Sequence, residues 1–157
     1  MTPRIPPPLL ALLAALAMRW LAGSMPVARL VSGELRWLGA VVAVLAATMM
    51  VSAALQFRRV RTTVNPMKPD TTTALVTSGV FAYSRNPMYL GLALILAGWA
   101  FWLGALTPWL VLPLFTTAIT ALQVLPEERA LARLFGRDFA AYRRTTDRWF
   151  GRFTASR

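Results

Sequence analysis

The sequence predicts an all-α integral membrane protein with about four transmembrane helices, two N-terminal and then a hairpin, plus a C-terminal cytoplasmic amphipathic helix. Three observations carry this prediction. The chain is 57% hydrophobic and its mean hydropathy is +0.53, well above the usual balance of soluble proteins. Long stretches of the chain carry no charge, and their lengths approach the roughly 20 residues that cross a hydrocarbon core. With 157 residues, the chain is long enough for a single domain.

Four apolar stretches are the candidate spans, at residues 8–21, 38–57, 88–106 and 109–125. Arg19 interrupts the first, whereas the second carries no charge. The third and fourth form the hairpin, with residues 106–108 as its turn. A secretory signal, with Arg4 ahead of an apolar stretch of about ten residues, is the alternative interpretation of the first stretch.

The distribution of lysine and arginine predicts the orientation in the membrane. The segment 58–87 and the tail after Leu125 are rich in basic residues, whereas the opposite side has only Arg19, Arg29 and Arg36. We therefore expect the N-terminus, the 58–87 loop and the C-terminus to be cytoplasmic, in a bacterial or archaeal plasma membrane. The net charge of +11 then reflects orientation and attraction to anionic membrane lipid. No nucleic-acid partner is expected, because the basic residues flank the spans.

The chain has no cysteine and no histidine. This excludes thiolate nucleophiles, disulfides, zinc sites built from these residues and imidazole acid–base catalysis. We expect no metal site. Any chemistry must use carboxylates, arginines, tyrosines and backbone groups, or a reactive cofactor.

The connection between the second and third spans is about thirty residues long, and loops of that length tend to be functional. Prolines at 66 and 69 oppose a regular helix there. The following segment 71–79 is β-prone and ends in a glycine turn. Phe81 and Tyr83 follow and suit the membrane interface or a bound ring system.

After the fourth span, Pro126, Glu127 and Glu128 predict the first turn of a soluble helix. An apolar stripe continues along it at three- and four-residue steps, through Leu131, Leu134, Phe135, Phe139 and Tyr142. We expect this helix to pack on the membrane surface or over the long loop. Within the third span, Gly91, Gly98 and Ala105 share one face, which favours close approach of a neighbouring helix.

Polar residues gather at one end of the predicted hairpin. Arg85, Asn86 and Tyr89 lie at the cytoplasmic end of the third span, and Glu127 and Glu128 lie just beyond the fourth. The hairpin brings these ends together, and the combination suits a zwitterionic ligand with an aromatic base. Each residue also has a structural interpretation: a helix cap, a headgroup anchor, a dipole charge or an interfacial aromatic.

The order of three motifs resembles the integral-membrane methyltransferases, the superfamily of isoprenylcysteine carboxyl methyltransferases and phospholipid methyltransferases. Their pattern is roughly LVTxGxY, RHPxYxG, then EE followed by LxxxFGxxYxxYxxR. In this chain the motifs read LVTSGVF at 75–81, SRNPMYLG at 84–91 and EERALARLFGRDFAAYRR at 127–144. The resemblance covers about residues 65 to 149.

The resemblance implies S-adenosylmethionine as methyl donor, bound on the cytoplasmic side between the loop and the C-terminal helix. It implies that Glu127 binds the ammonium group of the cofactor and that Arg85 fixes the loop or the carboxylates. An amine acceptor must also lose a proton, with which Glu128 or Tyr142 would help. The other positions that would line the cofactor pocket are Thr73, Ala74, Leu75, Val76, Phe81, Asn86, Pro87, Met88 and Tyr89.

Two positions depart from the family pattern. Asn86 replaces the usual histidine, although its amide still donates and accepts hydrogen bonds. Gln123 stands where the prenylcysteine enzymes have an arginine for the substrate carboxylate, which weakens the prediction of a carboxylate substrate. The acceptor is therefore expected to be a small or lipid-like hydrophobic molecule that presents a carboxylate, thiol or amine.

Methyl transfer has alternatives in other classes of membrane protein. A non-catalytic lipid-binding or scaffold protein is the main alternative, and an NADPH-dependent enzyme like the sterol reductases is a weaker one because the chain is short. A small multidrug exporter would need an acidic residue inside a span. None of the four predicted spans contains one.

Overall fold

The structure is a computed structural model that describes residues 5–25, 33–59 and 74–152. The described residues are mostly helical and include no strand, with turns, short irregular segments and an isolated bridge between Thr146 and Arg152. The all-α prediction is therefore confirmed. The helices are α1 (Pro7–Ser24), α2 (Gly33–Arg59), η2 (Gly79–Ala82), α3 (Pro87–Leu103), η3 (Thr107–Leu110), α4 (Val111–Ile119), η4 (Thr120–Val124) and α5 (Leu125–Thr145).

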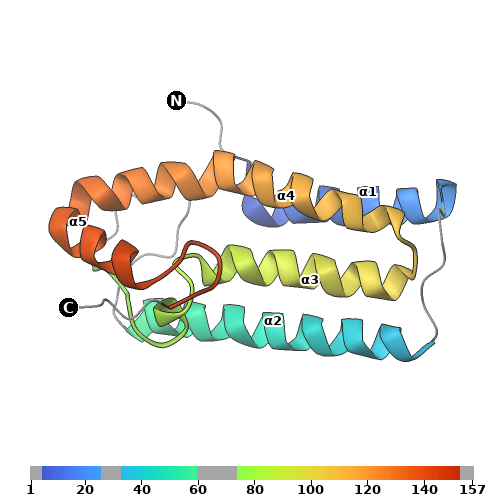
Figure 1. Ribbon diagram of the computed structural model, residues 1–157, viewed down its shortest axis with the longest axis horizontal. Helices are drawn as coiled ribbons and strands as arrows, with labels where there is room; N and C mark the ends of the chain where they lie inside the picture. Colours follow the sequence, from blue (N-terminus) through green and yellow to red (C-terminus); the bar gives the residue numbers. More distant parts are fainter. Residues whose placement is uncertain (1–4, 26–32, 60–73, 153–157) are drawn as a thin grey trace.

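Helices α1 to α4 lie side by side as an elongated bundle, and α5 extends beyond one end of it (Figure 1). Three helical segments of the described chain are long and apolar enough to cross a membrane: α1, residues 36–59 of α2, and the continuous stretch 107–145. Helix α3 is apolar but shorter, with 17 residues. Large apolar side chains such as Val44 and Leu114 are 65% and 69% exposed, as expected for surfaces that face lipid.

Small residues hold α2 and α3 close together, as the glycine spacing predicted. A Cβ atom built on Gly98 would lie 2.6 Å from the backbone oxygen of Gly39, and one on Gly39 would lie 2.5 Å from the oxygen of Gly98. Gly91 makes a similar approach to Met50 farther along the same pair of helices. Side chains at these positions would separate the two backbones, so the glycines set the distance between α2 and α3.

Helix α1 completes the bundle by packing against α3 and α4. Its Met18 is fully buried in a cluster that includes Leu96 of α3 and Phe115 of α4. The indole nitrogen of Trp99 donates a hydrogen bond to the carbonyl of Ala15 at 3.2 Å. The first helix is therefore an integral part of the fold.

The expected boundary between the fourth span and the C-terminal helix is absent. Pro126 does not begin a separate helix, because α4 continues through the π-helical turn η4 directly into α5. A proline inside a helix removes one backbone hydrogen bond, and a π turn is one local way to accommodate this. The hairpin therefore carries the first residues of α5 straight out of the bundle.

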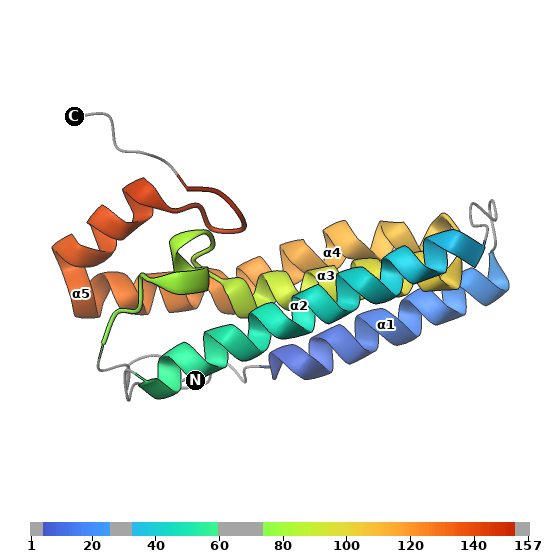
Figure 2. The ribbon, with the colours of Figure 1, turned by 90° about the horizontal axis from the view of Figure 1, so that it is seen from below.

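Helix α5 consists of two arms that meet at Gly136. This residue has φ +44° and ψ −109°, a conformation open essentially only to glycine. The second arm turns back over the loop that precedes α3 (Figure 2). Phe139 and Tyr142 of this arm are buried in a cluster with Val76 and Phe81 of the loop, so the prediction that the helix packs over the long loop is confirmed.

Candidate functional site

The described part of the long loop, residues 74–86, lies against both α2 and α5. It contains no strand, although the β-prone sequence extends to Gly79. Gly79 adopts φ +60° and begins the turn η2, and the side chain of Gln56 from α2 occupies the space where a Cβ would stand. Thr73, one of the predicted pocket residues, lies outside the described residues. Ala74, Leu75 and Val76 are the first part of the predicted pocket that the structure places.

Tyr142 connects the second arm of α5 to the loop. Its hydroxyl donates a hydrogen bond to the carbonyl of Phe81 at 2.6 Å and lies 3.5 Å from that of Ser84. Three residues farther along, the hydroxyl of Thr145 donates back to the carbonyl of Tyr142 at 3.1 Å. Tyr142 is buried, and a buried hydroxyl without a partner would be destabilising, so its hydrogen bond to Phe81 stabilises the contact between α5 and the loop.

The turn after α5, residues 146–152, is fastened to the loop mainly through backbone groups. The amide of Gly151 donates to the carbonyl of Tyr83 at 2.8 Å, and the amide of Arg85 donates to that of Asp147 at 3.0 Å. The hydroxyl of Thr146 adds a bond of 3.3 Å to the carbonyl of Ala82. We call residues 146–152 the C-terminal turn.

Asn86 adds a side-chain link to the same turn. Its Nδ2 donates to the carbonyl of Arg148 at 3.1 Å, and its own backbone amide donates to the hydroxyl oxygen of Ser84 at 3.1 Å. At the position where the family pattern more often has histidine, the Asn86 amide therefore links the start of α3 to the C-terminal turn. Asn86 and Pro87, the first residue of α3, are both buried.

Two arginines bind one carboxylate at the centre of this region. Glu128 Oε1 accepts hydrogen bonds from Arg85 Nη2 at 2.9 Å and from Arg148 Nε at 3.1 Å, and Glu128 Oε2 accepts one from Arg148 Nη2 at 2.9 Å. The side chains of Arg85 and Glu128 are only 8% and 9% exposed. The hydrogen bond to Glu128 raises the pKa of Arg148 above its ordinary value. We call these three residues the clamp.

Arg85 also reaches the backbone of α5. Its Nη1 donates to the carbonyl of Thr146 at 2.9 Å and to that of Arg143 at 3.3 Å. One guanidinium therefore contacts the first turn of α5 through Glu128, its last turn through Arg143, and the residue after the helix, Thr146. Charge-assisted bonds of this kind are about twice as strong as neutral ones.

The neighbouring glutamate has a different partner. The hydroxyl of Tyr89, on the first turn of α3, donates a hydrogen bond to Glu127 Oε1. Tyr89 is buried in the bundle core. The predicted convergence of the two hairpin ends is therefore present, with Arg85 and Tyr89 contacting Glu128 and Glu127 respectively. Met88 packs on the other side, against the cluster of Phe81 and Phe139.

Gln123 lies deeper in the bundle, within the π turn η4. Its side chain is buried, with the residue 1% exposed, and its Nε2 donates to the carbonyl of Ile5 at 2.6 Å. Its Oε1 has no hydrogen-bond partner among the residues that the structure describes. Buried acceptors of this kind are rare in folded proteins.

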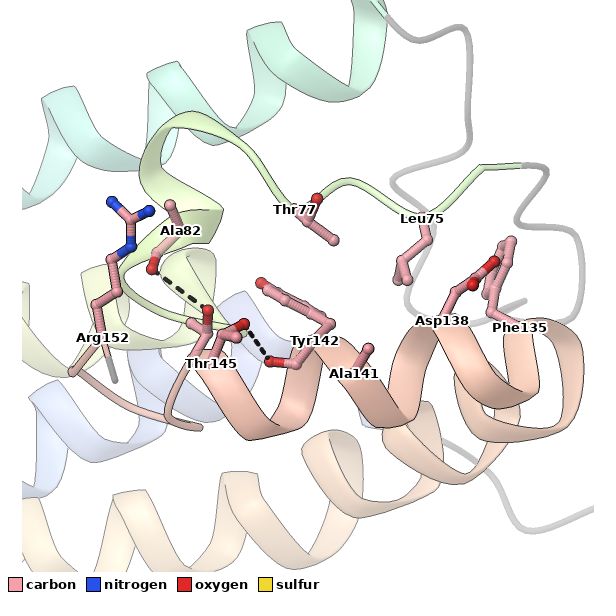
Figure 3. Close-up of a pocket in the computed structure, with 10 residues that line it drawn as sticks. Leu75, Thr77, Ala82, Phe135, Asp138, Ala141, Tyr142, Thr145 and Arg152 are labelled. Carbon is pink, nitrogen blue, oxygen red and sulfur yellow. Dashed lines mark hydrogen bonds between the residues drawn. The ribbon is translucent and has the colours of Figure 1, made fainter. Parts of the chain in front are cut away.

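A pocket of about 790 Å³ lies between the loop and the second arm of α5 (Figure 3). Of the predicted site residues, Leu75 and Tyr142 line it, whereas Glu127, Asn86 and Tyr89 do not. Its lining comes from three segments: Leu75, Thr77 and Ala82 of the loop, Phe135, Asp138, Ala141, Tyr142 and Thr145 of α5, and Thr146 and Arg152 of the C-terminal turn.

Sequence reasoning missed Arg148, Asp138 and Arg152. The sequence marks the two arginines only as basic charges of the tail, and no motif position assigns a role to Asp138. No spacing could reveal Arg148 as a partner of Glu128, because the two are 20 residues apart and meet only after α5 turns at Gly136. Metal ligation remains unsupported: the described residues include no group of three acidic, histidine or cysteine side chains that could hold an ion.

Comparison with known proteins places the chain among membrane methyltransferases. The profile of the family described as phospholipid methyltransferase matches residues 35–138, from α2 to just past the turn at Gly136. An uncharacterized protein of Haemophilus influenzae is 39% identical over 62 residues, which are 40% of this chain and 98% of that protein. No solved structure matches the chain.

Proposed function

Because the chain belongs to the phospholipid methyltransferase family, we propose that it transfers a methyl group from S-adenosylmethionine to a small or lipid-like hydrophobic substrate at the membrane interface. The family membership supports methyl transfer at a membrane, and the observation that carries the choice of cofactor is the pocket between the loop and α5. The resemblance implies that S-adenosylmethionine binds between the loop and the C-terminal helix, and the pocket lies between these two segments. The proposed orientation puts both of them, with the N-terminus, on the cytoplasmic side.

The residues of the pocket fit such a ligand. Its volume of about 790 Å³ lies within the roughly 300–1,000 Å³ of small-molecule sites. Phe135 and Leu75 offer apolar surface for a purine, and Asp138 and Arg152 offer one charge of each sign for polar groups. A nucleoside joined to an amino acid matches this mixture of surfaces.

Bound S-adenosylmethionine would supply a methyl group that its sulfonium already activates, so the protein has mainly to align and desolvate the reactants. Ala74, Val76, Met88 and Pro87 would shape the walls around the lining residues. Glu127 does not line the pocket, and its proposed role in binding the ammonium group rests on the resemblance of the third motif. The absence of histidine from the chain is compatible with this chemistry, because a carboxylate or thiolate acceptor needs no base.

Arg85, Glu128 and Tyr142 are proposed to position the site. Both oxygens of Glu128 already accept hydrogen bonds from guanidinium groups, and the hydroxyl of Tyr142 donates a hydrogen bond to the carbonyl of Phe81. These bonds leave neither group an obvious proton to exchange. We therefore assign them the task of holding the loop and the C-terminal turn in place around the cofactor.

Gln123 is proposed to face the acceptor substrate. A neutral amide cannot replace the charge of an arginine toward a carboxylate, whereas its unpaired oxygen accepts a hydrogen bond from an N–H or O–H group. Among the candidate acceptors this favours an amine or a neutral headgroup over an ionised carboxylate.

The decisive experiment is calorimetric titration of the detergent-purified protein with S-adenosylmethionine and, separately, with NADPH. Saturable binding of the first alone supports the proposal, and radiolabelled methyl transfer to lipid, thiol and amine acceptors then identifies the substrate. Binding of NADPH alone would favour a reductase. Binding of neither, in protein with a cooperative thermal unfolding transition, would favour the non-catalytic lipid-binding or scaffold function.

Replacing one carboxylate tests the predicted cofactor contact. We expect Glu127→Ala to abolish detectable binding of S-adenosylmethionine while the protein stays folded and extractable. Arg129→Ala, at an exposed position two residues along α5, is the matched control and should bind like the wild type. Full affinity in Glu127→Ala would refute the role assigned to Glu127.

A further inference from the structure

The two charged residues of the pocket lie at its opposite ends. Asp138 lies beside Phe135 and Leu75 at one end, and Arg152 lies beside Ala82 at the other, with the ring of Tyr142 between them (Figure 3). One end therefore combines an acid with apolar and aromatic surface. The other combines a guanidinium with small and hydroxyl-bearing residues.

Neither charge is neutralised by a neighbour within the described chain. Salt bridges of Arg85 and Arg148 both go to Glu128, whereas Asp138 and Arg152 form none with any residue of 5–25, 33–59 or 74–152. Both side chains are exposed at the pocket. The clamp arginines are thus committed to the fold, and the two pocket charges are available to a ligand.

The chemistry of the two ends assigns a direction to the ligand. A carboxylate accepts hydrogen bonds from the hydroxyl groups of a ribose, as acidic residues do in other nucleotide sites, and an aromatic ring beside it suits a purine. A guanidinium binds a carboxylate through two parallel hydrogen bonds. The reverse direction would place the ligand carboxylate beside Asp138, where like charges repel.

We propose that the ligand lies along the pocket with its nucleoside at Asp138 and Phe135 and its amino-acid carboxylate at Arg152. This inference rests on the proposed function and adds the direction of the cofactor and two residues that recognise it. The amino-acid end then lies against the C-terminal turn, the segment that Arg148 ties to Glu128.

Two related ligands separate the two ends in a binding experiment. S-adenosylhomocysteine contains both the nucleoside and the amino acid, whereas 5′-deoxy-5′-methylthioadenosine contains the nucleoside alone. We expect Arg152→Gln to weaken binding of S-adenosylhomocysteine about tenfold or more and to leave the affinity for methylthioadenosine unchanged. We expect Asp138→Asn to weaken both ligands by a similar factor. Calorimetric titration of the detergent-purified variants measures each affinity.

Matched variants and unfolding measurements guard against indirect effects. Arg144→Gln removes an exposed arginine of α5 that does not line the pocket and should bind both ligands like the wild type. Arg152→Lys keeps the charge and should retain part of the affinity for S-adenosylhomocysteine. Thermal unfolding midpoints equal to that of the wild type in all four variants establish that the fold is intact.

The inference is overturned if Arg152→Gln weakens both ligands equally, if Asp138→Asn spares methylthioadenosine, or if neither variant changes an affinity. In those three cases wild-type binding still supports the proposed function. If the folded wild-type protein binds neither S-adenosylhomocysteine nor S-adenosylmethionine, the proposed function fails together with the inference.

Discussion

The clamp makes a quantitative prediction for Arg148→Ala. This substitution removes the two hydrogen bonds that the Arg148 guanidinium donates to Glu128, at 3.1 and 2.9 Å. It leaves the backbone carbonyl of Arg148, and hence its bond from Asn86, in place. The C-terminal turn should then remain folded against the loop but open more often.

The magnitude follows from the burial of the two partners. Hydrogen bonds to charged groups contribute about 1.5–3 kcal/mol each. The Arg148 side chain is 33% exposed, so water replaces part of this loss, and Arg85 still pairs with Glu128. We therefore expect the free energy of opening the C-terminal turn to fall by about 2–3 kcal/mol, which corresponds to roughly 30- to 150-fold faster opening-dependent exchange.

Hydrogen exchange with mass spectrometry measures this opening directly. The informative amides are those of Gly151 and Arg85, which donate to the carbonyls of Tyr83 and Asp147. Arg148→Lys keeps the charge but loses the two-pronged geometry, so its exchange should lie between those of the wild type and the alanine variant. Arg144→Ala, an exposed arginine one turn earlier, should leave exchange within about twofold of wild type.

Unchanged exchange at these amides in Arg148→Ala would refute the role of the clamp in holding the turn. An equal acceleration in Arg144→Ala would also refute it, because the effect would then be one of net charge and not of the bonds to Glu128. The measurement does not depend on a ligand, so its outcome is independent of the proposed function.

Two further predictions concern the bundle and its orientation. Gly98→Ala should lower the thermal unfolding midpoint, because its Cβ would lie 2.6 Å from the Gly39 carbonyl oxygen. Gly23→Ala, whose Cβ would make only ordinary contacts, should leave the midpoint unchanged. Equal midpoints in the two variants would contradict the close packing of α2 and α3. Since the chain contains no cysteine, a single introduced cysteine reports which side of the membrane its position faces. In intact cells Leu106→Cys should react with a membrane-impermeant maleimide, and Ala132→Cys should not. The opposite pattern would contradict the proposed orientation.

Local sequence signals were sufficient for the bundle and for half of the site. Apolar stretches of near-spanning length predicted where the helices lie. The turn at 106–108 predicted that Tyr89 and Glu127 come together, because the two helices of a hairpin are antiparallel and their ends farthest from the turn lie side by side. The glycine spacing predicted that a neighbouring helix approaches the third span closely, because residues seven apart share one face of a helix. The structure identifies this neighbour as α2.

The rest of the site depends on a change of direction that sequence periodicity does not encode. The apolar stripe from Leu131 to Tyr142 predicts one face of a single continuous helix. The turn at Gly136 instead directs Phe139 and Tyr142 into the loop and leaves Leu134 44% exposed. Only after this turn does Arg148 come within reach of Glu128, so a residue that looked like a surface charge becomes part of the buried clamp.

The consecutive glutamates 127 and 128 connect the two halves of the site. Successive residues of an α-helix point about 100° apart, so the two carboxylates cannot face the same neighbour. Glu127 faces Tyr89 at the start of α3 and Glu128 faces Arg85 and Arg148. The first turn of α5 therefore binds the membrane hairpin on one side and the loop with its C-terminal turn on the other. A ligand between the loop and α5 would therefore be held by a framework that is anchored in the bundle.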